Sequence, residues 1–279
     1  MGEKVIKIFA SDLDGTFFNS QKNFDKNLFT KILKKIELID GRFIIATGRE
    51  PALIKTVFAD FLENPIVDFM ANNGAYVTAN HKVVQYNYID ENTVKAVWDF
   101  FEEFEQAPDK LITFSTLEHV YIPKRFLEPG QTHLLNVPVE ITPIDSADQI
   151  KGKVMKIACV WKELNESADQ LTKQLQAQFG DVVHATQSGF GTIDIISGDV
   201  NKAQGLSVYA QTLSIKPEEI AAFGDNDNDL EMLNYVGKPF VMPNAPERIL
   251  SIGYPKADDD NENSGVLKTI ERITENNHE

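Results

Sequence analysis

The chain has 279 residues, of which 42% are hydrophobic and 25% charged, a composition typical of globular proteins and a length sufficient for two domains. Its formal net charge of −15 argues against a nucleic-acid partner, because phosphate backbones are bound by clustered Lys and Arg. A single cysteine excludes an intrachain disulfide framework, and the absence of a signal-like start or 18 consecutive apolar residues predicts a soluble, cytoplasmic protein without a membrane partner.

The first part of the chain predicts strands that alternate with helices. The expected elements are a strand ending at residue 11, a helix over 25–39, a strand over 42–46, a helix over 51–62, a strand over 66–70 and a hairpin of strands 75–78 and 83–88 with its turn at 79–82. Strands alternating with helices are typical of right-handed crossovers and a parallel sheet.

The pattern changes between about residues 87 and 196, where helices and strands mix in a region long enough for its own domain. The expected elements there are helices over 93–104 and 167–179 and strands over 120–122, 155–160, 182–186 and 192–196. Cys159 lies in an apolar run, so we expect a buried core thiol rather than a reactive one.

The parallel rhythm resumes towards the end of the chain. A helix over 202–213, a strand over 220–223, a short helix after residue 229 and a strand over 239–242 are expected. We therefore predict an α/β fold with a Rossmann-like parallel-sheet core, residues 1–86 and 197–279, and an inserted α+β domain, residues 87–196.

Two aspartates follow the first strand. Asp12 and Asp14 are two residues apart and point the same way, while Gly15 allows a sharp turn. Two carboxylates held in this way can bind a hard cation or divide the roles of nucleophile and acid. For residues 12–16 taken alone, an acidic turn without a function is the alternative.

Polar motifs also follow later strands. Thr47, Gly48 and Arg49 lie at the sheet edge where ligands bind, and a hydroxyl with a backbone N–H there can bind a phosphate oxygen. Residues 224–229, Gly-Asp-Asn-Asp-Asn-Asp, offer oxygen ligands for a hard cation. An EF-hand is the competing interpretation, but Leu230 and Val236 occupy the positions that require Gly and Glu.

Lys202 begins a predicted helix between these motifs. A lysine at such a position is, taken alone, more often a surface residue. In order with the other motifs it becomes a candidate ligand for phosphate and carboxylate groups.

Together, these motifs resemble in order the four motifs of haloacid dehalogenase superfamily phosphatases, and the chain is similar to the Cof-type sugar-phosphate phosphatases within that superfamily. The resemblance rests on residues 12–16, 47–49, 202 and 224–229, on the inserted domain, and on Asn73-Gly74-Ala75, Met242, Asn244-Ala245 and Gly265-Val266. Ala203 stands where the family usually has Gly, and Phe17 where Leu is common. Neither departure removes a reacting group.

The resemblance implies a phosphatase with a haloacid-dehalogenase-like core and a cap that closes over it. The implied reaction is Mg²⁺-dependent hydrolysis of a phosphate monoester of a small metabolite, a sugar phosphate or phosphorylated cofactor, through an aspartyl-phosphate. Asp12 would be the nucleophile, and Asp14 would protonate the leaving alcohol and later accept a proton from water. Asp12, the backbone carbonyl of Asp14 and Asp225 would hold Mg²⁺, while Asp229 would orient these ligands.

The same resemblance implies the phosphate ligands. Thr47, Gly48, Lys202 and Asn228 would bind the phosphoryl oxygens, whereas Arg49 and Asn73 face the same edge without an assigned role. The candidate residues for substrate selection in the cap are His119, Lys124, Arg125 and His184, each of which is, taken alone, more often a surface residue.

Two other functions remain open at this point. A phosphotransferase or phosphomutase would pass the phosphoryl group from the aspartate to a second hydroxyl. A non-catalytic regulatory module could keep the fold without the activity, although the presence of every reacting group argues against it. The sequence predicts no particular oligomeric state.

Overall fold

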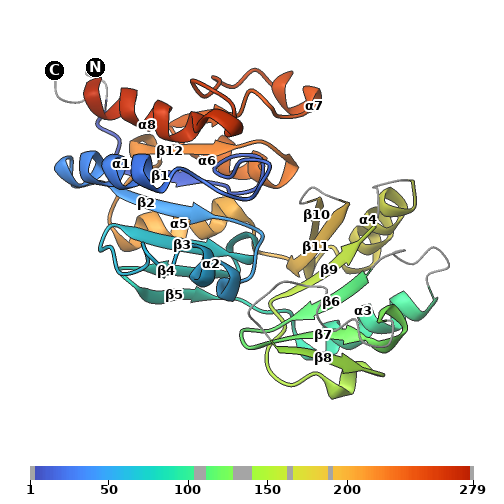
Figure 1. Cartoon of the computed structure of the whole chain (residues 1–279). Helices are drawn as coiled ribbons and strands as arrows, with labels where there is room; N and C mark the ends of the chain where they lie inside the picture. Colours follow the sequence, from blue (N-terminus) through green and yellow to red (C-terminus); the bar gives the residue numbers. More distant parts are fainter. Residues whose placement is uncertain (1–3, 104–110, 128–139, 162–165, 188–190, 277–279) are drawn as a thin grey trace. The chain divides into compact units, whose positions relative to one another are not determined.

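The computed structural model describes residues 4–103, 111–127, 140–161, 166–187 and 191–276 (Figure 1). The chain divides into two compact units. The first contains Met1–Thr47, Ala59–Gln85 and Asn201–Glu279, and the second contains Gly48–Phe58 and Tyr86–Val200. One boundary between the units therefore falls between Thr47 and Gly48, inside a predicted phosphate-binding motif.

The first unit contains a seven-stranded sheet of order β13-β12-β1-β2-β3-β4-β5. Its strands are β1 (Ile8–Ser11), β2 (Arg42–Ala46), β3 (Val67–Ala71), β4 (Tyr76–Ala79), β5 (Lys82–Tyr86), β12 (Ile220–Gly224) and β13 (Lys238–Val241). The pairs β1–β2, β2–β3, β1–β12 and β12–β13 are parallel. This sheet confirms the predicted α/β class with a Rossmann-like core.

The strand order reverses at β1. From β1 the chain proceeds to β2 and β3 on one side, and it later returns to β12 on the other side. Ligands of open parallel sheets bind beyond the carboxyl ends of the strands at such a reversal. The ends of β1 and β12 are therefore the expected place for a site.

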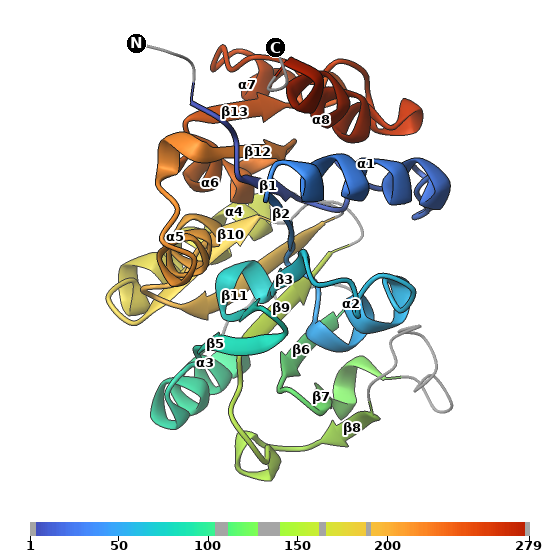
Figure 2. The same cartoon turned by 90° about the vertical axis from the view of Figure 1, so that its left-hand side faces the viewer.

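Helices cover both faces of this sheet (Figure 1, Figure 2). Helices α1 (Lys26–Leu38) and α8 (Gly265–Asn276) pack together on one face, and α5 (Lys202–Thr212) and α6 (Leu230–Tyr235) on the other. The short α7 (Glu247–Leu250) follows β13. Because side chains alternate along a strand, Ile8 and Ala10 pack with the α5 residues Leu206 and Tyr209. Asp12, two residues beyond Ala10, follows the same alternation towards α5.

Side-chain caps fix the beginnings of two helices. The Asp25 side chain accepts from Leu28 N at 2.8 Å, and the Asn201 side chain accepts from Gln204 N at 2.8 Å. Each satisfies a backbone N–H that the helix itself leaves without a partner. The Asn201 cap makes Lys202 the first residue of α5.

Helix α2 (Pro51–Val57) ends before residue 62, where the sequence predicted its end. Phe58 closes the helix, and the chain then passes into the first unit. There the ring of Phe61 lies 4.8 Å from that of Phe29 and 5.8 Å from that of Phe24. Packing of Phe61 in this aromatic cluster requires the chain to leave the helical path.

The second unit contains a six-stranded sheet of order β10-β11-β9-β6-β7-β8. Its other elements are β6 (Leu111–Ser115), β7 (His119–Pro123), β8 (Glu140–Ile144), β9 (Lys156–Val160), β10 (Val183–Gln187), β11 (Thr192–Ser197), α3 (Glu91–Glu103) and α4 (Glu166–Phe179). Residue 104, the predicted end of the helix over 93–104, lies outside the described residues. The core between the sheet and these two helices includes Ile157 and Cys159.

Cys159 is fully buried in this core, as predicted. Burial raises the pKa of its thiol well above the ordinary value, and Asp194 adds to the effect. The thiolate is the reactive form of cysteine, so Cys159 is an inert packing residue.

Two α-helices and two strands of the described residues have no counterpart in the sequence prediction: α7, α8, β6 and β8. Strand β8 is one of the two edge strands of its sheet and contains Pro143. Proline lacks the N–H that a central strand donates, so a run that contains it predicts a strand only weakly.

No helix in the described part of the chain is long and apolar enough to cross a membrane.

Candidate active site

The loop after β1 carries Asp12 to the edge of the first unit's sheet. Asp12 N donates to Phe223 O of β12 at 3.0 Å, which ties the start of the loop to the neighbouring strand. Gly15 has a φ of +78°, and a Cβ at this position would lie 2.5 Å from Asp225 Oδ2. Only glycine lets the turn form so close to that carboxylate. Thr16 Oγ1 donates to Asp225 Oδ1 at 2.7 Å and joins the two loops.

Lys202 is fully buried, so the surface alternative for this lysine is wrong. Its Nζ lies 2.7 Å from Asp12 Oδ1 and 2.6 Å from Asp229 Oδ1. A buried ammonium requires such partners, because desolvation of an unpaired charge costs several kcal/mol. Burial lowers the pKa of Lys202, but the two carboxylates outweigh it and raise the pKa above the ordinary value. Lys202 is therefore a permanent cation in this site.

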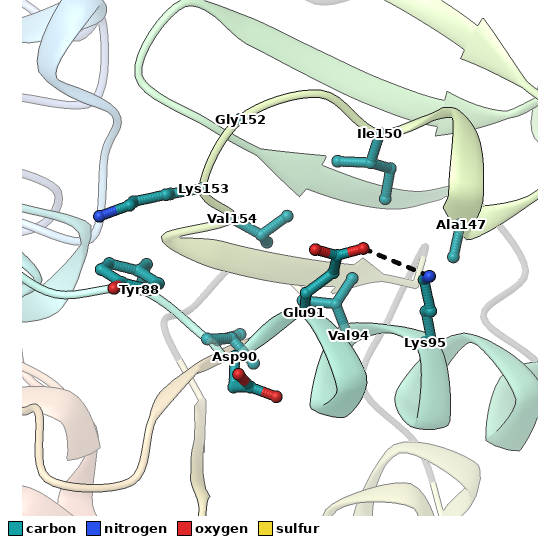
Figure 3. A pocket seen from close by; sticks show the side chains of 11 residues that line it. Tyr88, Asp90, Glu91, Val94, Lys95, Ala147, Ile150, Gly152, Lys153 and Val154 are labelled. Carbon is teal, nitrogen blue, oxygen red and sulfur yellow. Dashed lines mark ion pairs between the residues drawn. The ribbon is translucent and has the colours of Figure 1, made fainter.

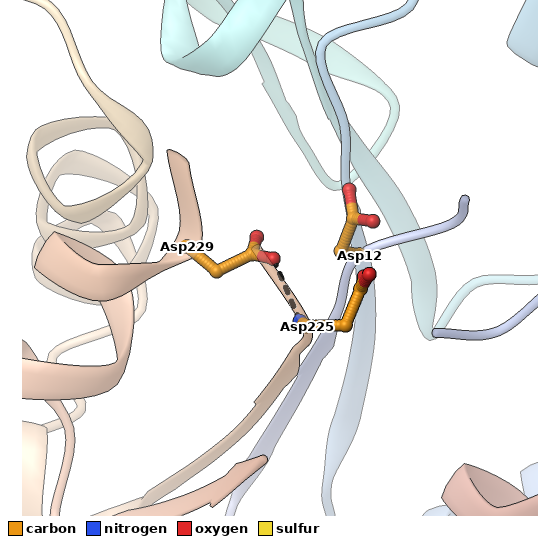
Figure 4. Close-up of side chains that lie close together, drawn as sticks. All are labelled: Asp12, Asp225 and Asp229. Carbon is orange, nitrogen blue, oxygen red and sulfur yellow. Dashed lines mark hydrogen bonds between the residues drawn. The ribbon is translucent and has the colours of Figure 1, made fainter. Parts of the chain in front are cut away.

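Asp229 is held on both of its oxygens. Besides the contact from Lys202 to Oδ1, its Oδ2 accepts from Asp225 N at 2.9 Å (Figure 4) and from Asn226 N at 3.1 Å. Gly224 permits this close packing, because a Cβ there would lie 2.4 Å from Asp229 Cβ. Asp227 of the same loop instead forms an ion pair with Arg248 at 2.5 Å. The loop therefore contributes Asp225 and Asp229 to the site.

Asp12, Asp225 and Asp229 form a group that fits a hard cation. Each offers a carboxylate oxygen, and these oxygens lie within 4.8 Å of one another (Figure 4). Oxygen ligands of this kind are those that Mg²⁺ and Ca²⁺ prefer.

The pKa shifts of these carboxyl groups also favour a bound cation. Burial raises the pKa of Asp12 well above its ordinary value, Lys202 opposes the shift, and Asp229 and Asp225 add to it. Burial, followed by the charge of Asp229, raises the pKa of Asp225 to about 7. The single ammonium thus leaves negative charge uncompensated, and a divalent cation would balance it.

Asp14 lies beside a cation that the sequence motifs did not single out. Lys22 Nζ contacts Asp14 Oδ1 at 2.5 Å. Lys22 has a φ of +60°, in a turn where Asn19 Oδ1 accepts from the backbone N–H groups of Gln21 at 3.1 Å and Asn23 at 3.0 Å. The turn-forming Asn19 was the only sequence signal for this arrangement.

Three other predicted residues meet through hydrogen bonds at the ends of β2, β3 and β12. Asn73 N donates to Thr47 O at 3.0 Å, and Asn73 Oδ1 accepts from Asn228 Nδ2 at 3.1 Å. All three residues are buried. Asn73 sits in a left-handed turn with a φ of +52°, a conformation that asparagine tolerates better than most residues. Asn73 thus links the two predicted phosphate ligands Thr47 and Asn228.

The remaining predicted residues belong to the second unit. Gly48 O accepts from Lys156 Nζ at 2.7 Å, and Arg49 is half-buried. Lys124 pairs with Asp145, Arg125 pairs with Glu102, His119 lies on β7 and His184 lies on β10.

The second unit also contains a cavity of about 340 Å³ (Figure 3). Its lining combines the apolar Ile89, Val94, Ile150 and Val154 with charged groups. Lys95 at its edge is paired with Glu91 at 3.3 Å and with Asp148 at 2.8 Å. None of the residues singled out by the sequence motifs lines this cavity.

Comparison with known proteins agrees with this geometry. Residues 9–270 match the model of a family described as haloacid dehalogenase-like hydrolases. The chain is 26% identical to the 5-amino-6-(5-phospho-D-ribitylamino)uracil phosphatase YbjI of Escherichia coli strain K12, over 96% of each chain. It is also 26% identical to the phosphatase YitU of Bacillus subtilis, which has the same activity in its name, over 94% of this chain and 96% of YitU. The crystal structure of SMU.1108c from Streptococcus mutans superposes with a TM-score of 0.86 at 28% identity, covering 96% of this chain and 98% of that one.

Proposed function

The chain belongs to the haloacid dehalogenase-like hydrolase family and is a phosphatase, and from that membership we propose that it hydrolyses phosphate monoesters of small metabolites through an aspartyl-phosphate on Asp12. The family match confirms the resemblance seen in the four motifs. The observation that carries the proposal is the buried contact of Lys202 with Asp12 and Asp229. The ammonium of Lys202 holds Asp12 Oδ1. Among the described residues, no donor forms a hydrogen bond to Asp12 Oδ2.

In the first step, an oxygen of Asp12 attacks phosphorus and the bond from phosphorus to the leaving oxygen breaks. Asp14 donates a proton to that oxygen, so the substrate leaves as a neutral alcohol. The buried ammonium of Lys202 fixes the direction of the Asp12 carboxylate and balances the charge of the phosphoryl oxygens. Thr47, Gly48 and Asn228 bind the same oxygens in this proposal.

In the second step, water attacks phosphorus and the bond to Asp12 breaks. Asp14 accepts the proton of the water and so regains the proton that it donated in the first step, Asp12 is restored as a carboxylate, and inorganic phosphate is released. Asp14 is partly exposed, with 19% of its side chain accessible. Such a position suits a group that exchanges protons with substrate and water.

We propose Mg²⁺ as the cation of the carboxylate group. Asp12, the backbone carbonyl of Asp14 and Asp225 would hold it, and Asp229 would orient the loop through the N–H groups of Asp225 and Asn226. When bound, Mg²⁺ supplies charge stabilisation for the transferring phosphoryl group.

The proposed domain division gives the inserted residues 87–196 the role of a cap over the core formed by 1–86 and 197–279. The two 5-amino-6-(5-phospho-D-ribitylamino)uracil phosphatases among the relatives support a phosphorylated sugar or sugar-like alcohol as the substrate class. We therefore place that compound among the first to be tested.

The test is phosphate release from a panel of monoesters: that uracil compound, hexose and pentose phosphates, phosphorylated cofactors and p-nitrophenyl phosphate. We expect release with Mg²⁺ and none after chelation by EDTA, with kcat/KM for the preferred ester of roughly 10⁴ M⁻¹s⁻¹ or more. Transfer to a second hydroxyl without release would favour a phosphomutase. A panel without any release or transfer would reject the catalytic proposal.

Mg²⁺ binding is expected to strengthen as the pH rises towards neutrality. The pKa of Asp225 is about 7 in the metal-free protein, so below pH 7 a proton competes with the cation for this carboxylate. We expect the apparent affinity to fall by up to about tenfold for each pH unit below 7 and to level off above it. Calorimetric Mg²⁺ titrations at pH 5.5, 6.5, 7.5 and 8.5 measure this dependence, and equal affinities at all four values would contradict it.

Stability without Mg²⁺ should follow the opposite trend. The pKa of Asp225 in the folded protein lies above its ordinary value of 3.8. The stabilisation that this carboxyl gives the folded state is therefore fully present below pH 3.8 and is lost as the pH rises through 7. The increase in melting temperature caused by Mg²⁺ should therefore grow between pH 5.5 and 8.5. Asp225→Asn removes this titration and should show a smaller increase with a shallower pH dependence.

A further inference from the structure

The sheet of the second unit carries a buried lysine that the proposed mechanism does not use. Lys156 is the first residue of β9 and is 5% exposed. Its neighbour Ile157 and the next alternate residue, Cys159, face the core under α3 and α4. Because side chains alternate along a strand, Lys156 faces the opposite side of the sheet.

The ammonium of Lys156 contacts the loop after β2 at two points. Nζ lies 2.7 Å from Gly48 O and 3.0 Å from Glu50 Oε1. Glu50 Oε1 also accepts from Ser115 Oγ at 3.3 Å. Gly48 and Glu50 flank Arg49, so the two contacts bracket that residue.

The sheet register brings these groups together. Ser115 of β6 lies directly opposite Lys156 of β9. Asp194 of β11 pairs with Ala158 and is therefore a diagonal neighbour of Lys156 on the same face, with 3.6 Å between Asp194 Oδ1 and Lys156 Nζ. Both Asp194 and Ser115 are buried. One face of the sheet thus offers buried polar side chains that contact the loop.

An ion pair between Lys156 and Glu50 stabilises the contact between the loop and the sheet. Burial lowers the pKa of Lys156, but Asp194 and Glu50 outweigh it and raise the pKa above the ordinary value. Lys156 in turn lowers the pKa of Glu50 against the effect of burial. The lysine and the glutamate are therefore both charged at neutral pH, and a buried charged pair is strongly destabilised when one partner is removed.

Glu50 departs from the usual behaviour of its position. It is the N-cap residue of α2, a position where the side chain of Ser, Thr, Asp or Asn normally accepts from a backbone N–H of the first turn. Its side chain makes no such bond and points to Lys156 instead. The carboxylate thus fixes the preceding loop to the sheet rather than capping its own helix.

We propose that Lys156 is a positioning residue for substrate binding: through Gly48 and Glu50 it fixes the backbone around Arg49, so that this loop can bind the anionic substrate. The peptide group between Gly48 and Arg49 is trans, so holding its carbonyl also sets the opposite direction of its N–H. The guanidinium of Arg49 suits phosphate and carboxylate groups by its planar set of donors. This inference rests on the proposed phosphatase function.

The test compares Lys156→Met with Lys153→Met, a matched change of an exposed lysine in the same unit. We expect Lys156→Met to raise KM for the preferred ester about tenfold while kcat stays within about threefold, and Lys153→Met to change neither. A purely structural lysine would lower the melting temperature and the active fraction and leave KM unchanged. That outcome would overturn the proposal.

A second measurement does not depend on catalysis. Hydrogen–deuterium exchange should be about tenfold faster in the peptide that covers residues 48–58 of Lys156→Met, and unchanged in Lys153→Met. If Lys156→Met fails to fold, Glu50→Gln replaces it, because this change keeps the size of the side chain. Glu50→Gln should also raise KM and speed the exchange of residues 48–58, but by smaller factors. Unchanged exchange would show that Lys156 does not hold the loop. Wild-type protein without activity on any ester would instead reject the phosphatase proposal, and exchange would still decide the role of Lys156.

Discussion

Asp12→Asn is expected to abolish turnover while the protein remains folded. An amide has no anionic oxygen to attack phosphorus, so phosphate release should fall by about four orders of magnitude or more. The fold should tolerate the change, because Lys202 keeps Asp229 as a partner at 2.6 Å and burial already opposes the charge of Asp12. Steady-state phosphate release and thermal unfolding of the same preparation measure both expectations.

The proposed covalent intermediate gives this prediction a second readout. Wild-type enzyme quenched with acid during turnover should carry one phosphoryl group, seen as a mass increase, and Asp12→Asn should carry none. Asp60→Asn is a matched control, because Asp60 is an exposed aspartate of the same unit that pairs with the exposed Lys26. It should keep wild-type activity, since exposed ion pairs contribute little. Activity of Asp12→Asn within tenfold of wild type would refute the nucleophile assignment.

The sequence predicts the parts of this molecule that have local signals. Strand β2 begins and ends where it was expected, and α1 begins at Lys26, directly after the capping residue Asp25. Asp12 and Asp225 each directly follow a buried strand, and a parallel sheet brings the carboxyl ends of such strands to one edge. The geometry of a parallel sheet therefore gathers residues that lie far apart in the sequence.

Contacts that depend on tertiary packing have no such signal. Lys156 and Gly48 meet only because the second unit holds the loop after β2, and nothing near either residue indicates the other. Lys22 reaches Asp14 through an irregular turn, and the end of α2 is set by the packing of Phe61. Gly48 and Thr47 are adjacent in one motif, yet they belong to different units. A motif thus indicates the chemistry of its residues better than the elements that hold them.

Lys202→Met should destabilise the protein and remove its activity together. The variant leaves Asp12 and Asp229 buried without their shared ammonium, and loss of one partner of a buried ion pair costs about 3–5 kcal/mol. Activity should fall by about three orders of magnitude, because in the proposed mechanism the same cation stabilises the transferring phosphoryl group. Urea unfolding and phosphate release at pH 7.5 measure the two effects, and a variant as stable as wild type at that pH would contradict the charge-balance account.

The pH dependence of this variant identifies the cause of its instability. Lys202 opposes the rise of the Asp12 pKa, so its removal should raise that pKa further. A carboxylate with a raised pKa in the folded state stabilises fully below its unfolded pKa and loses that contribution as the pH rises. The deficit of Lys202→Met should therefore be largest near neutral pH and shrink as the pH falls towards 4, whereas a deficit from lost packing would not change.

Adding Asp229→Asn to Lys202→Met separates charge balance from catalysis. The double variant removes one uncompensated carboxylate, so part of the lost stability should return, because the two changes act on groups in direct contact at 2.6 Å. Activity should not return, since neither change restores a cation beside the phosphoryl group. Stability that recovers without activity would show that the ammonium of Lys202 has two separable effects: it balances the buried carboxylates of the resting site, and it stabilises the charge of the group transferred to Asp12.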